Sequence, residues 1–368
     1  MRKIDKDKRV FLHKQFYALL RKEIESGKYK PGEYIPSERE LVERYSLSRT
    51  TIRQGIAQLI SEGWLCSVPG TGTFVSEVIS AREKKTRPKS KNIALVLKLP
   101  YSPLDSPYYS KIFRSMQEEV ARRGYHFSFY SFTEESKLDL LSVIRERDLD
   151  GVVFIGRMKE GIVLDVYKNK TPLVVVDNYI NKKGITAVIP DNQRGGFEVT
   201  RYLTDLGHKK IYFLGVRPDD IVSAERFNGY KEALDQAGIP YGKEFSIKDS
   251  FSVSNGYSIM EDILKSGTLP TAIVAINDEV AIGAMKALSE KSGLSVPGDI
   301  SVTGFDDIDW AAHTSPSLTT VRIQKEETGV LAVKFLIEQI ENEDFTDVKV
   351  VTPVELIIRS SCSAPSKG

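Results

Sequence analysis

The stretch IPSERELVERYSLSRTTIRQGIAQLISEGWL, residues 35–65, combines helix-start signals with basic side chains and decides the fold of the N-terminal region. Ser37 is followed three residues later by Glu40, which is the pattern of a capping box, and it predicts a short helix through Arg44. The next residues, SLS, predict a tight turn in which Ser48 caps another helix. The stretch therefore predicts two helices joined by a turn.

The second of these helices carries an apolar stripe that consists of Ile52, Ile56, Leu59 and Ile60. We expect this stripe to pack on the short helix and on an earlier helix at residues 11–26, which shows helical spacing of its apolar residues. Polar and basic side chains fill the remaining arc. This order of elements predicts a helix-turn-helix unit, whose last helix enters the major groove of DNA.

A Gly-rich segment follows the helices. The residues WLCSVPGTGTFV, 64–75, predict two short strands joined by a turn that contains Gly70, and a tip of this kind can approach a DNA groove closely. Trp64 and Phe74 are expected in the core beneath this hairpin. The N-terminal unit is therefore predicted to be a winged helix.

The charge of the chain is unevenly distributed. Residues 1–91 contain 20 Lys and Arg against 11 Asp and Glu, a net charge of +9, whereas residues 92–368 contain 32 against 39, a net charge of −7. A basic module joined to an acidic body indicates that one end meets a polyanion. Arginine suits guanine edges and phosphates, and threonine hydroxyls suit phosphate oxygens, so double-stranded DNA is the expected partner.

This part of the chain contains the motifs PSEREL (36–41), SRTTIR (48–53), GWL (63–65) and GTGTFV (70–75). In their order and spacing it resembles the winged-helix domain of GntR-family regulators over roughly residues 10–76. The resemblance implies that Arg39, Arg49, Arg53 and Gly70 contact DNA and that the neighbouring Thr50 and Thr51 reach phosphates, and Ser48 belongs to the same candidate set. The alternative for each arginine is a solvated helix surface or an ion pair with Glu38, Glu40 or Glu43, and Arg44 is assigned to that alternative.

The domain division follows from composition. Residues 1–76 are assigned to the winged helix-turn-helix domain, and the polar, basic residues 77–91 to a linker that is either a plain tether or a nonspecific phosphate contact. From residue 92 onward, continuous apolar strands alternate with helical patterns, which indicates parallel sheets covered on both faces. Residues 92–368 are therefore predicted to form a doubly wound α/β body, long enough for two lobes.

Polar residues follow several of the expected strands. They are Gly156 and Arg157, Asp177 and Asn178, Asn277 and Asp278, and Asp306 and Asp307. Ligands of open α/β sheets bind outside the carboxyl ends of the strands, so these side chains can converge on one cleft. Carboxylates and amides exchange hydrogen bonds with hydroxyl groups, and the set therefore suits a neutral, polyhydroxylated ligand.

The second region contains the segments SAERFNGYKEAL (223–234), AINDEVAIGAM (275–285) and VPGDISVTGFDD (296–307). Through them it resembles the effector-binding domain of LacI/GalR-type repressors, which is akin to periplasmic sugar-binding proteins. The resemblance implies a two-lobed periplasmic-binding-protein-like body, also the site of dimerisation, with a sugar held by Tyr109, Asp177, Arg226, Phe251, Asn277 and Asp306.

Structural roles are the alternatives for several of these residues. Asn277 and Asp306 can cap or turn the chain, Phe251 can belong to the core, and Asp191 and Asn192 are expected to cap the helix that follows them. Some sugar-responsive relatives place a Gln on the ligand after the segment LTTV, but that register here holds Ile323, with Gln324 one place later.

A GntR-type head on a LacI-type body resembles the arabinose repressors of Gram-positive bacteria. This implies a dimeric repressor that binds an operator and responds to a small sugar, with L-arabinose as the expected effector. A sugar-binding protein or a sugar-processing enzyme without a regulatory role is the alternative. No metal, cofactor or nucleophile motif is recognisable, and the N-terminus lacks a signal peptide, so we expect a non-enzymatic, cytoplasmic protein without membrane contact.

Overall fold

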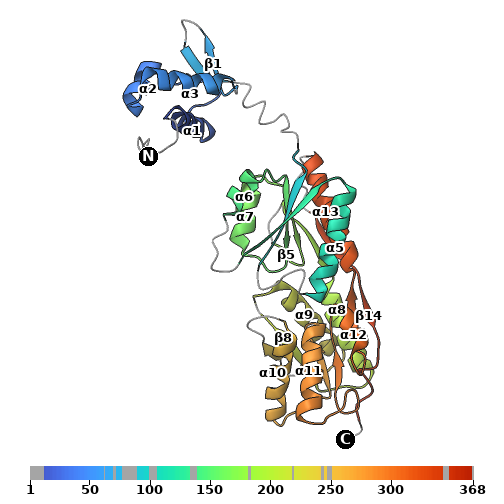
Figure 1. The fold of residues 1–368 in the computed structure, drawn as a ribbon. Helices are drawn as coiled ribbons and strands as arrows, with labels where there is room; N and C mark the ends of the chain where they lie inside the picture. Colours follow the sequence, from blue (N-terminus) through green and yellow to red (C-terminus); the bar gives the residue numbers. More distant parts are fainter. Residues whose placement is uncertain are drawn as a thin grey trace. The chain divides into compact units, whose positions relative to one another are not determined.

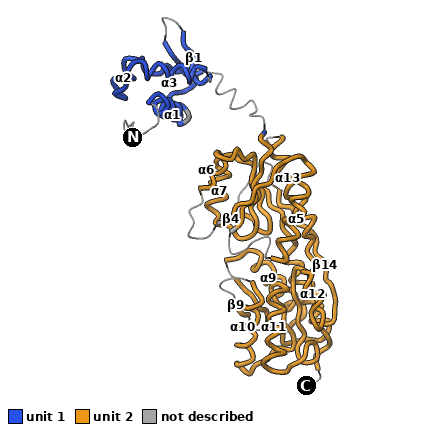
Figure 2. The backbone as a smooth tube through the Cα atoms, viewed as in Figure 1, with its two compact units in different colours: residues 1–89 blue, residues 90–368 orange. Residues whose placement is uncertain are grey.

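The chain forms two compact units, Met1–Lys89 and Ser90–Gly368 (Figure 2). The computed structural model describes residues 12–61, 63–68, 72–76, 89–98, 106–132, 139–180, 184–217, 219–241, 244–246, 251–342 and 348–366. Gly70 and residues 77–88 of the expected linker lie outside these ranges, so the linker and the boundaries drawn around it remain predictions.

The described residues of the first unit form three helices and a two-stranded antiparallel sheet (Figure 1). Its elements are α1 (Leu12–Glu25), α2 (Glu38–Tyr45), α3 (Arg49–Ser61), β1 (Leu65–Val68) and β2 (Gly72–Val75). The predicted capping box at Ser37 and Glu40 is present, with reciprocal hydrogen bonds between side chain and backbone at the start of α2. The turn between α2 and α3 begins at Ser46, which adopts a left-handed backbone conformation with φ 53°.

The core of the first unit forms where the three helices meet. Ile52, Ile56 and Leu59 of α3 are buried together with residues of α1 and α2, as the apolar stripe predicts. The inclusion of Ile60 in that stripe was wrong, because its side chain is 37% exposed. At about 100° per residue, position 60 lies some 80° around the helix from position 52 and falls at the edge of the buried face.

The second unit is built on two parallel sheets that define its two lobes. Lobe 1 has a six-stranded sheet in the order β13-β7-β6-β5-β3-β4 and lobe 2 a four-stranded sheet in the order β11-β10-β8-β9. The strands of lobe 1 are β3 (Asn92–Lys98), β4 (His126–Phe132), β5 (Gly151–Ile155), β6 (Leu173–Val176), β7 (Thr186–Pro190) and β13 (Lys349–Thr352). The strands of lobe 2 are β8 (Ile211–Val216), β9 (Glu244–Ser246), β10 (Ala272–Ala275) and β11 (Ser301–Thr303).

Helices cover the sheets of both lobes (Figure 1). Lobe 1 has α5 (Pro107–Arg122), α6 (Leu140–Glu146), α7 (Glu160–Lys168) and α13 (Lys325–Asn342). Lobe 2 has α8 (Asn192–Asp205), α9 (Ile221–Gln236), α10 (Val253–Lys265), α11 (Asp278–Lys291) and α12 (Asp309–His313). An antiparallel pair, β12 (Thr320–Ile323) and β14 (Val354–Ile357), lies beside α8.

Residue alternation along β3 explains the layering of lobe 1. Ile93, Leu95 and Leu97 belong to the cluster that packs under α5 and α13, whereas Ala94 and Val96 belong to the cluster under α6 and α7. Successive side chains of a strand point to opposite faces, so a continuous apolar run is needed where helices cover both. The prediction of a doubly wound, two-lobed α/β body is confirmed, although β7, β9, β12, β13 and β14 were not singled out as strands.

Candidate functional site

The start of α3 is exposed, as a surface that meets DNA requires. The Ser48 hydroxyl accepts a hydrogen bond from the Thr51 backbone N–H at 3.2 Å, so Ser48 caps the helix as predicted. Its Oγ also lies 2.7 Å from Thr51 Oγ1. Arg49 and Thr50 are exposed beside it. The structure therefore brings hydroxyl groups, one guanidinium group and the N-terminal end of a helix together on one face.

The three candidate arginines all pair with glutamates. Glu38 accepts hydrogen bonds from the Nε atoms of Arg49 and Arg53, at 3.0 and 2.9 Å, and Glu43 accepts one from Arg39 at 3.4 Å. Partial burial opposes ionisation of Glu38, but the two guanidinium groups outweigh it and lower the pKa of this carboxyl. The pairing considered as the alternative to DNA contact is thus present for each arginine.

These ion pairs leave the arginines accessible. The side chains of Arg39, Arg49 and Arg53 are 90%, 69% and 60% exposed. Exposed pairs of this kind contribute about 0–1 kcal/mol, so a phosphate or a guanine edge can replace the glutamate at small cost. Arg44 differs from them, because it donates a hydrogen bond of 2.8 Å to the Tyr29 hydroxyl, consistent with its assignment away from DNA.

The hairpin after α3 has the geometry of a wing. β1 and β2 pair in antiparallel register, and Gly72 has a φ of 131°, which only glycine adopts readily. The Phe74 ring packs edge-on against Tyr34 with 5.7 Å between ring centroids. Trp64 packs against the core of the unit, as expected for a residue beneath the hairpin. The guanidinium carbon of Arg21 lies 4.8 Å from the centroid of the Trp64 ring.

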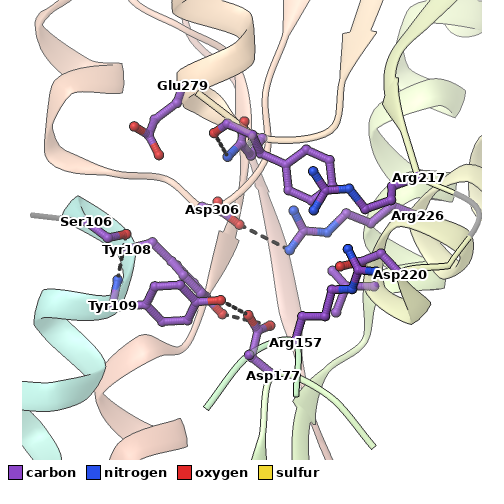
Figure 3. A pocket seen from close by; sticks show the side chains of 14 residues that line it. Ser106, Tyr108, Tyr109, Arg157, Asp177, Arg217, Asp220, Arg226, Glu279 and Asp306 are labelled. Atoms are coloured by element: carbon purple, nitrogen blue, oxygen red, sulfur yellow. Dashed lines mark hydrogen bonds and ion pairs between the residues drawn. The ribbon is translucent and has the colours of Figure 1, made fainter. Parts of the chain in front are cut away.

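The second unit contains a polar cavity, here called the inner cavity, of about 80 Å³ (Figure 3). All six residues proposed from the sequence to hold the effector line it: Tyr109, Asp177, Arg226, Phe251, Asn277 and Asp306. Since a cavity that holds one water needs roughly 10–15 Å³, this cavity has room for a small ligand that displaces several waters.

Asp177 stands at the end of β6, the centre of the sheet of lobe 1. It has a φ of 56°, and it accepts hydrogen bonds from the Tyr108 and Tyr109 hydroxyls at 3.2 and 3.0 Å (Figure 3). Burial raises the pKa of this carboxyl to about 7, against the opposing effect of the Arg226 charge. The two tyrosines come from the first turn of α5, which Ser106 caps.

Arg226 of α9 is 5% exposed and connects three strand ends. Its guanidinium group donates to Asn192 Oδ1 at 3.0 Å, to the Ile276 carbonyl at 2.7 Å and to Asp306 Oδ1 at 3.2 Å. It also lies 3.7 Å from the centroid of the Phe305 ring. These bonds to described residues use three of its five N–H groups, so a ligand in the cavity meets a fixed cation that can donate further hydrogen bonds.

Asn277 and Asp306 combine structural and cavity-lining positions. The Asn277 side chain accepts from the Val280 N–H at 2.9 Å, which caps α11, and donates to the Phe251 carbonyl at 3.1 Å. Burial raises the pKa of Asp306, although Arg226 and Lys325 oppose the shift. Asn277 therefore caps α11, which was the alternative to ligand binding, and it also lines the cavity.

The loop behind Asp306 is fixed by three basic side chains. Asp306 and Asp307 have φ values of 104° and 50°, and Lys325 donates to both of their carbonyl oxygens. The Asp307 carboxylate accepts from Arg322 at 2.8 Å and from Arg359 at 2.6 Å. Two adjacent aspartates thus have different surroundings, one beside the cavity and one between two arginines.

Other expectations near the cavity have mixed outcomes. Asp191 caps α8 as expected, whereas Asn192 is a buried residue of the first turn that bonds Arg226 and Glu225 instead. Ile323 is 1% exposed and belongs to the core. Gln324 lines a separate pocket.

Three charged residues of the cavity were not predicted from the sequence: Arg217, Asp220 and Glu279. Arg217 is 4% exposed, and its guanidinium carbon lies 4.6 Å from the Phe251 ring centroid. Glu279, near the start of α11, also lines the cavity, and burial together with the nearby Asp306 raises the pKa of its carboxyl to about 7. Arg217 directly follows β8, so the strand-end rule that found Asp177 could have found it; Glu279 lies too far past β10 for that rule.

The cavity offers hydrogen-bond donors and acceptors from both lobes and an aromatic face, which suits a polyhydroxylated molecule.

No group of three or more His, Cys, Asp or Glu placed to hold a metal ion occurs within the described ranges. None of the helices that the structure describes is both long and apolar enough to cross a membrane. A winged-helix head and a two-lobed body with a polar cleft define the class of ligand-controlled DNA-binding proteins.

Comparisons with known proteins agree with this class. Residues 12–75 match the model for bacterial regulatory proteins of the gntR family, and residues 200–362 match the periplasmic binding protein-like domain. The chain is 31% identical to an "Arabinose metabolism transcriptional repressor" of Geobacillus stearothermophilus, covering 91% of this chain and 93% of that protein. It is 32% identical to the "HTH-type transcriptional repressor PurR" of Pasteurella multocida, covering 70% and 78%.

A solved structure of a LacI family transcriptional regulator from Enterococcus faecium with bound ribose shares the fold of the body. Its TM-score is 0.65 at 26% identity, covering 74% of this chain and 99% of that one. This chain therefore belongs to the family of transcriptional repressors that join a gntR-family DNA-binding domain to a LacI-type, periplasmic-binding-protein-like domain.

Proposed function

We propose that this repressor releases its operator when a small sugar occupies the inner cavity, and that the sugar is L-arabinose. The observation that carries the proposal is the convergence of Asp177, Arg226, Asn277 and Asp306 on one polar cavity of about 80 Å³. Carboxylates bind sugar hydroxyls as acceptors and the guanidinium group binds sugar oxygens as a donor. Phe251 supplies a ring for the apolar face of the sugar.

The choice of L-arabinose rests on relatives. Two proteins named "Arabinose metabolism transcriptional repressor", from Geobacillus stearothermophilus and Halalkalibacterium halodurans, align with 91% and 89% of this chain. The ribose bound to the Enterococcus faecium regulator is also a pentose.

The proposed switch has two states. Arg39, Arg49 and Arg53, with Ser48, Thr50, Thr51 and Gly70, bind one half-site of a palindromic operator, and a homodimer places two such heads on the two half-sites. Sugar binding favours the closed arrangement of the two lobes and thereby changes the spacing of the heads. To move the equilibrium from 1:99 to 99:1, the sugar must bind one state about 10⁴-fold more tightly than the other.

The test uses the full-length protein and a duplex that it selects from a pool of random oligonucleotides. Band-shift titrations are run without sugar and with L-arabinose, D-ribose, D-xylose or D-glucose. We expect L-arabinose to release the duplex at lower concentration than the other sugars. Release by a different sugar contradicts the arabinose assignment, and operator binding that no sugar changes contradicts the sugar-controlled switch.

A further inference from the structure

A second, larger hollow adjoins the inner cavity. This outer chamber has a volume of about 470 Å³ and shares four lining residues with the inner cavity: Arg157, Asp177, Asp220 and Val222. Its other walls come from both lobes, including Asn178 and Tyr179 after β6 and Ile221 at the start of α9. A ligand longer than one sugar ring could therefore extend from the inner cavity into the outer chamber without leaving the cleft.

An ion pair connects the two lobes at the boundary between these spaces. Arg157 follows β5 in lobe 1 and lines both spaces, whereas Asp219 follows β8 in lobe 2 and lines the outer chamber alone. The Arg157 guanidinium group donates a hydrogen bond to the Asp219 carboxylate. Since the two residues come from different lobes, their contact ties the lobes together through Arg157, a residue that lines both spaces.

The two side chains are accessible to solvent, at 40% for Arg157 and 61% for Asp219. A pair of this exposure is a weak link that solvent and salt compete with. It therefore suits a contact that opens and closes as a ligand enters, and we expect its removal to change binding rates by a small factor without unfolding the protein.

We propose that the Arg157–Asp219 ion pair selects effectors by length: it closes the inner cavity over a single sugar ring and excludes a second ring from the outer chamber. The inference rests on the proposed function, because it assumes that the cleft binds a sugar. Asp219 acts from outside the inner cavity, so its contribution is to positioning and exclusion and involves no direct contact with the enclosed ring.

The experiment compares L-arabinose with the disaccharide α-1,5-L-arabinobiose on the full-length protein. Isothermal titration calorimetry gives both affinities, and stopped-flow fluorescence gives the rate at which L-arabinose dissociates. The test variant is Asp219→Asn, which removes the charge at nearly constant volume. The matched control is Asp165→Asn, since Asp165 pairs with Lys168 on α7, lines neither space and is 62% exposed.

In the wild-type protein we expect the monosaccharide to bind and the disaccharide to bind at least tenfold more weakly. In Asp219→Asn we expect L-arabinose to dissociate roughly two- to fivefold faster, as loss of one exposed ion pair predicts, and the disaccharide to gain affinity by a similar factor. Asp219→Glu, which keeps the charge, should restore wild-type selectivity, and Asp165→Asn should not change it.

Two results would contradict the proposed role of the Arg157–Asp219 ion pair, here called the selector, and they can be told apart. If the wild-type protein binds L-arabinose but Asp219→Asn keeps the wild-type ratio of the two affinities, the selector is wrong and the proposed function stands. If the wild-type protein binds neither carbohydrate, the proposed function fails and the selector fails with it.

Discussion

The two candidate sites of this repressor use arginine–carboxylate pairs under opposite conditions. On α3, Arg49 and Arg53 share Glu38 at the surface, with most of each arginine side chain exposed. In the inner cavity, Arg226 and Asp306 form a pair whose side chains are 6% and 7% exposed. The exposed pairs can exchange their glutamate for another anion, which suits a surface that binds and releases a polyanion. The buried pair keeps its geometry, which suits a cavity that orients a small ligand.

The largest expected effect tests the fixed pair. Arg226→Met keeps much of the side-chain volume but removes the guanidinium group that pairs directly with the buried Asp306 carboxylate. We expect a loss of about 3–5 kcal/mol in the free energy of unfolding, as for other broken buried pairs, together with loss of sugar binding. Urea denaturation and calorimetry measure the two effects.

The control is Arg201→Met, because Arg201 pairs with Glu198 on α8 at 50% exposure. We expect this variant to lose less than about 1 kcal/mol. Equal losses in the two variants would show that burial does not distinguish the pairs.

The second prediction tests the exchangeable pairs. Arg49→Ala and Arg53→Ala should each weaken binding to the selected duplex by about 1–3 kcal/mol and leave the thermal stability of the protein nearly unchanged. Arg44→Ala is the comparison within the same unit, since Arg44 bonds Tyr29, and its DNA affinity should stay within about twofold of wild type. Fluorescence anisotropy at several salt concentrations measures these affinities. A larger loss of affinity in Arg44→Ala than in Arg49→Ala or Arg53→Ala would contradict the assignment of the latter two arginines to DNA.

The third prediction concerns pH and the inner cavity. Folding raises the pKa of the Asp177 and Glu279 carboxyls to about 7, so the folded protein holds protons that the unfolded chain has released. The free energy of unfolding contributed by these groups is therefore greatest below the unfolded pKa near 4 and falls as pH rises toward 7. Thermal melts from pH 5 to 8 should show a falling melting temperature.

Glu279→Gln should reduce this slope, whereas Glu118→Gln on the exposed face of α5 should leave it unchanged. A melting temperature that rises with pH in wild type and is unaffected by Glu279→Gln would contradict the assignment of buried, proton-holding carboxyls to the cavity.

The smallest expected effect comes from Glu38. Glu38→Gln removes the carboxylate that competes with phosphate for Arg49 and Arg53. The affinity for any duplex should therefore rise by up to roughly fivefold at low salt, and the gain should disappear as salt screens the pairs. Glu43→Gln, which affects only Arg39, should give a smaller gain. A loss of affinity in Glu38→Gln would show that this carboxylate orients the arginines and that the pair is not merely exchangeable.

Local signals in the sequence predicted much of this molecule. The capping box at Ser37 and Glu40, the apolar stripe of α3 and the continuous apolar run of β3 depend on neighbouring residues, so they could be predicted directly. The strand-end rule placed Asp177, Asn277 and Asp306 in one cavity because parallel strands end at the same edge of a sheet. The resemblance to known families added Arg226, Phe251 and Tyr109.

Contacts between distant segments were beyond such rules. The pairing of Glu38 with both arginines was only one of several possible pairings, and Asn192 was expected to cap a helix where it instead bonds Arg226. Glu279 and the Arg157–Asp219 contact depend on how two lobes approach each other, which no local pattern specifies. The position of Ile60 at the edge of the stripe shows that hydrophobicity alone does not determine burial.

The anchoring of the Asp306–Asp307 loop has a thermodynamic consequence. Because Lys325, Arg322 and Arg359 already immobilise this loop, an arriving ligand spends none of its interaction free energy on ordering it. A substitution that frees this loop should therefore weaken ligand binding, because part of the interaction free energy would then be spent on ordering it.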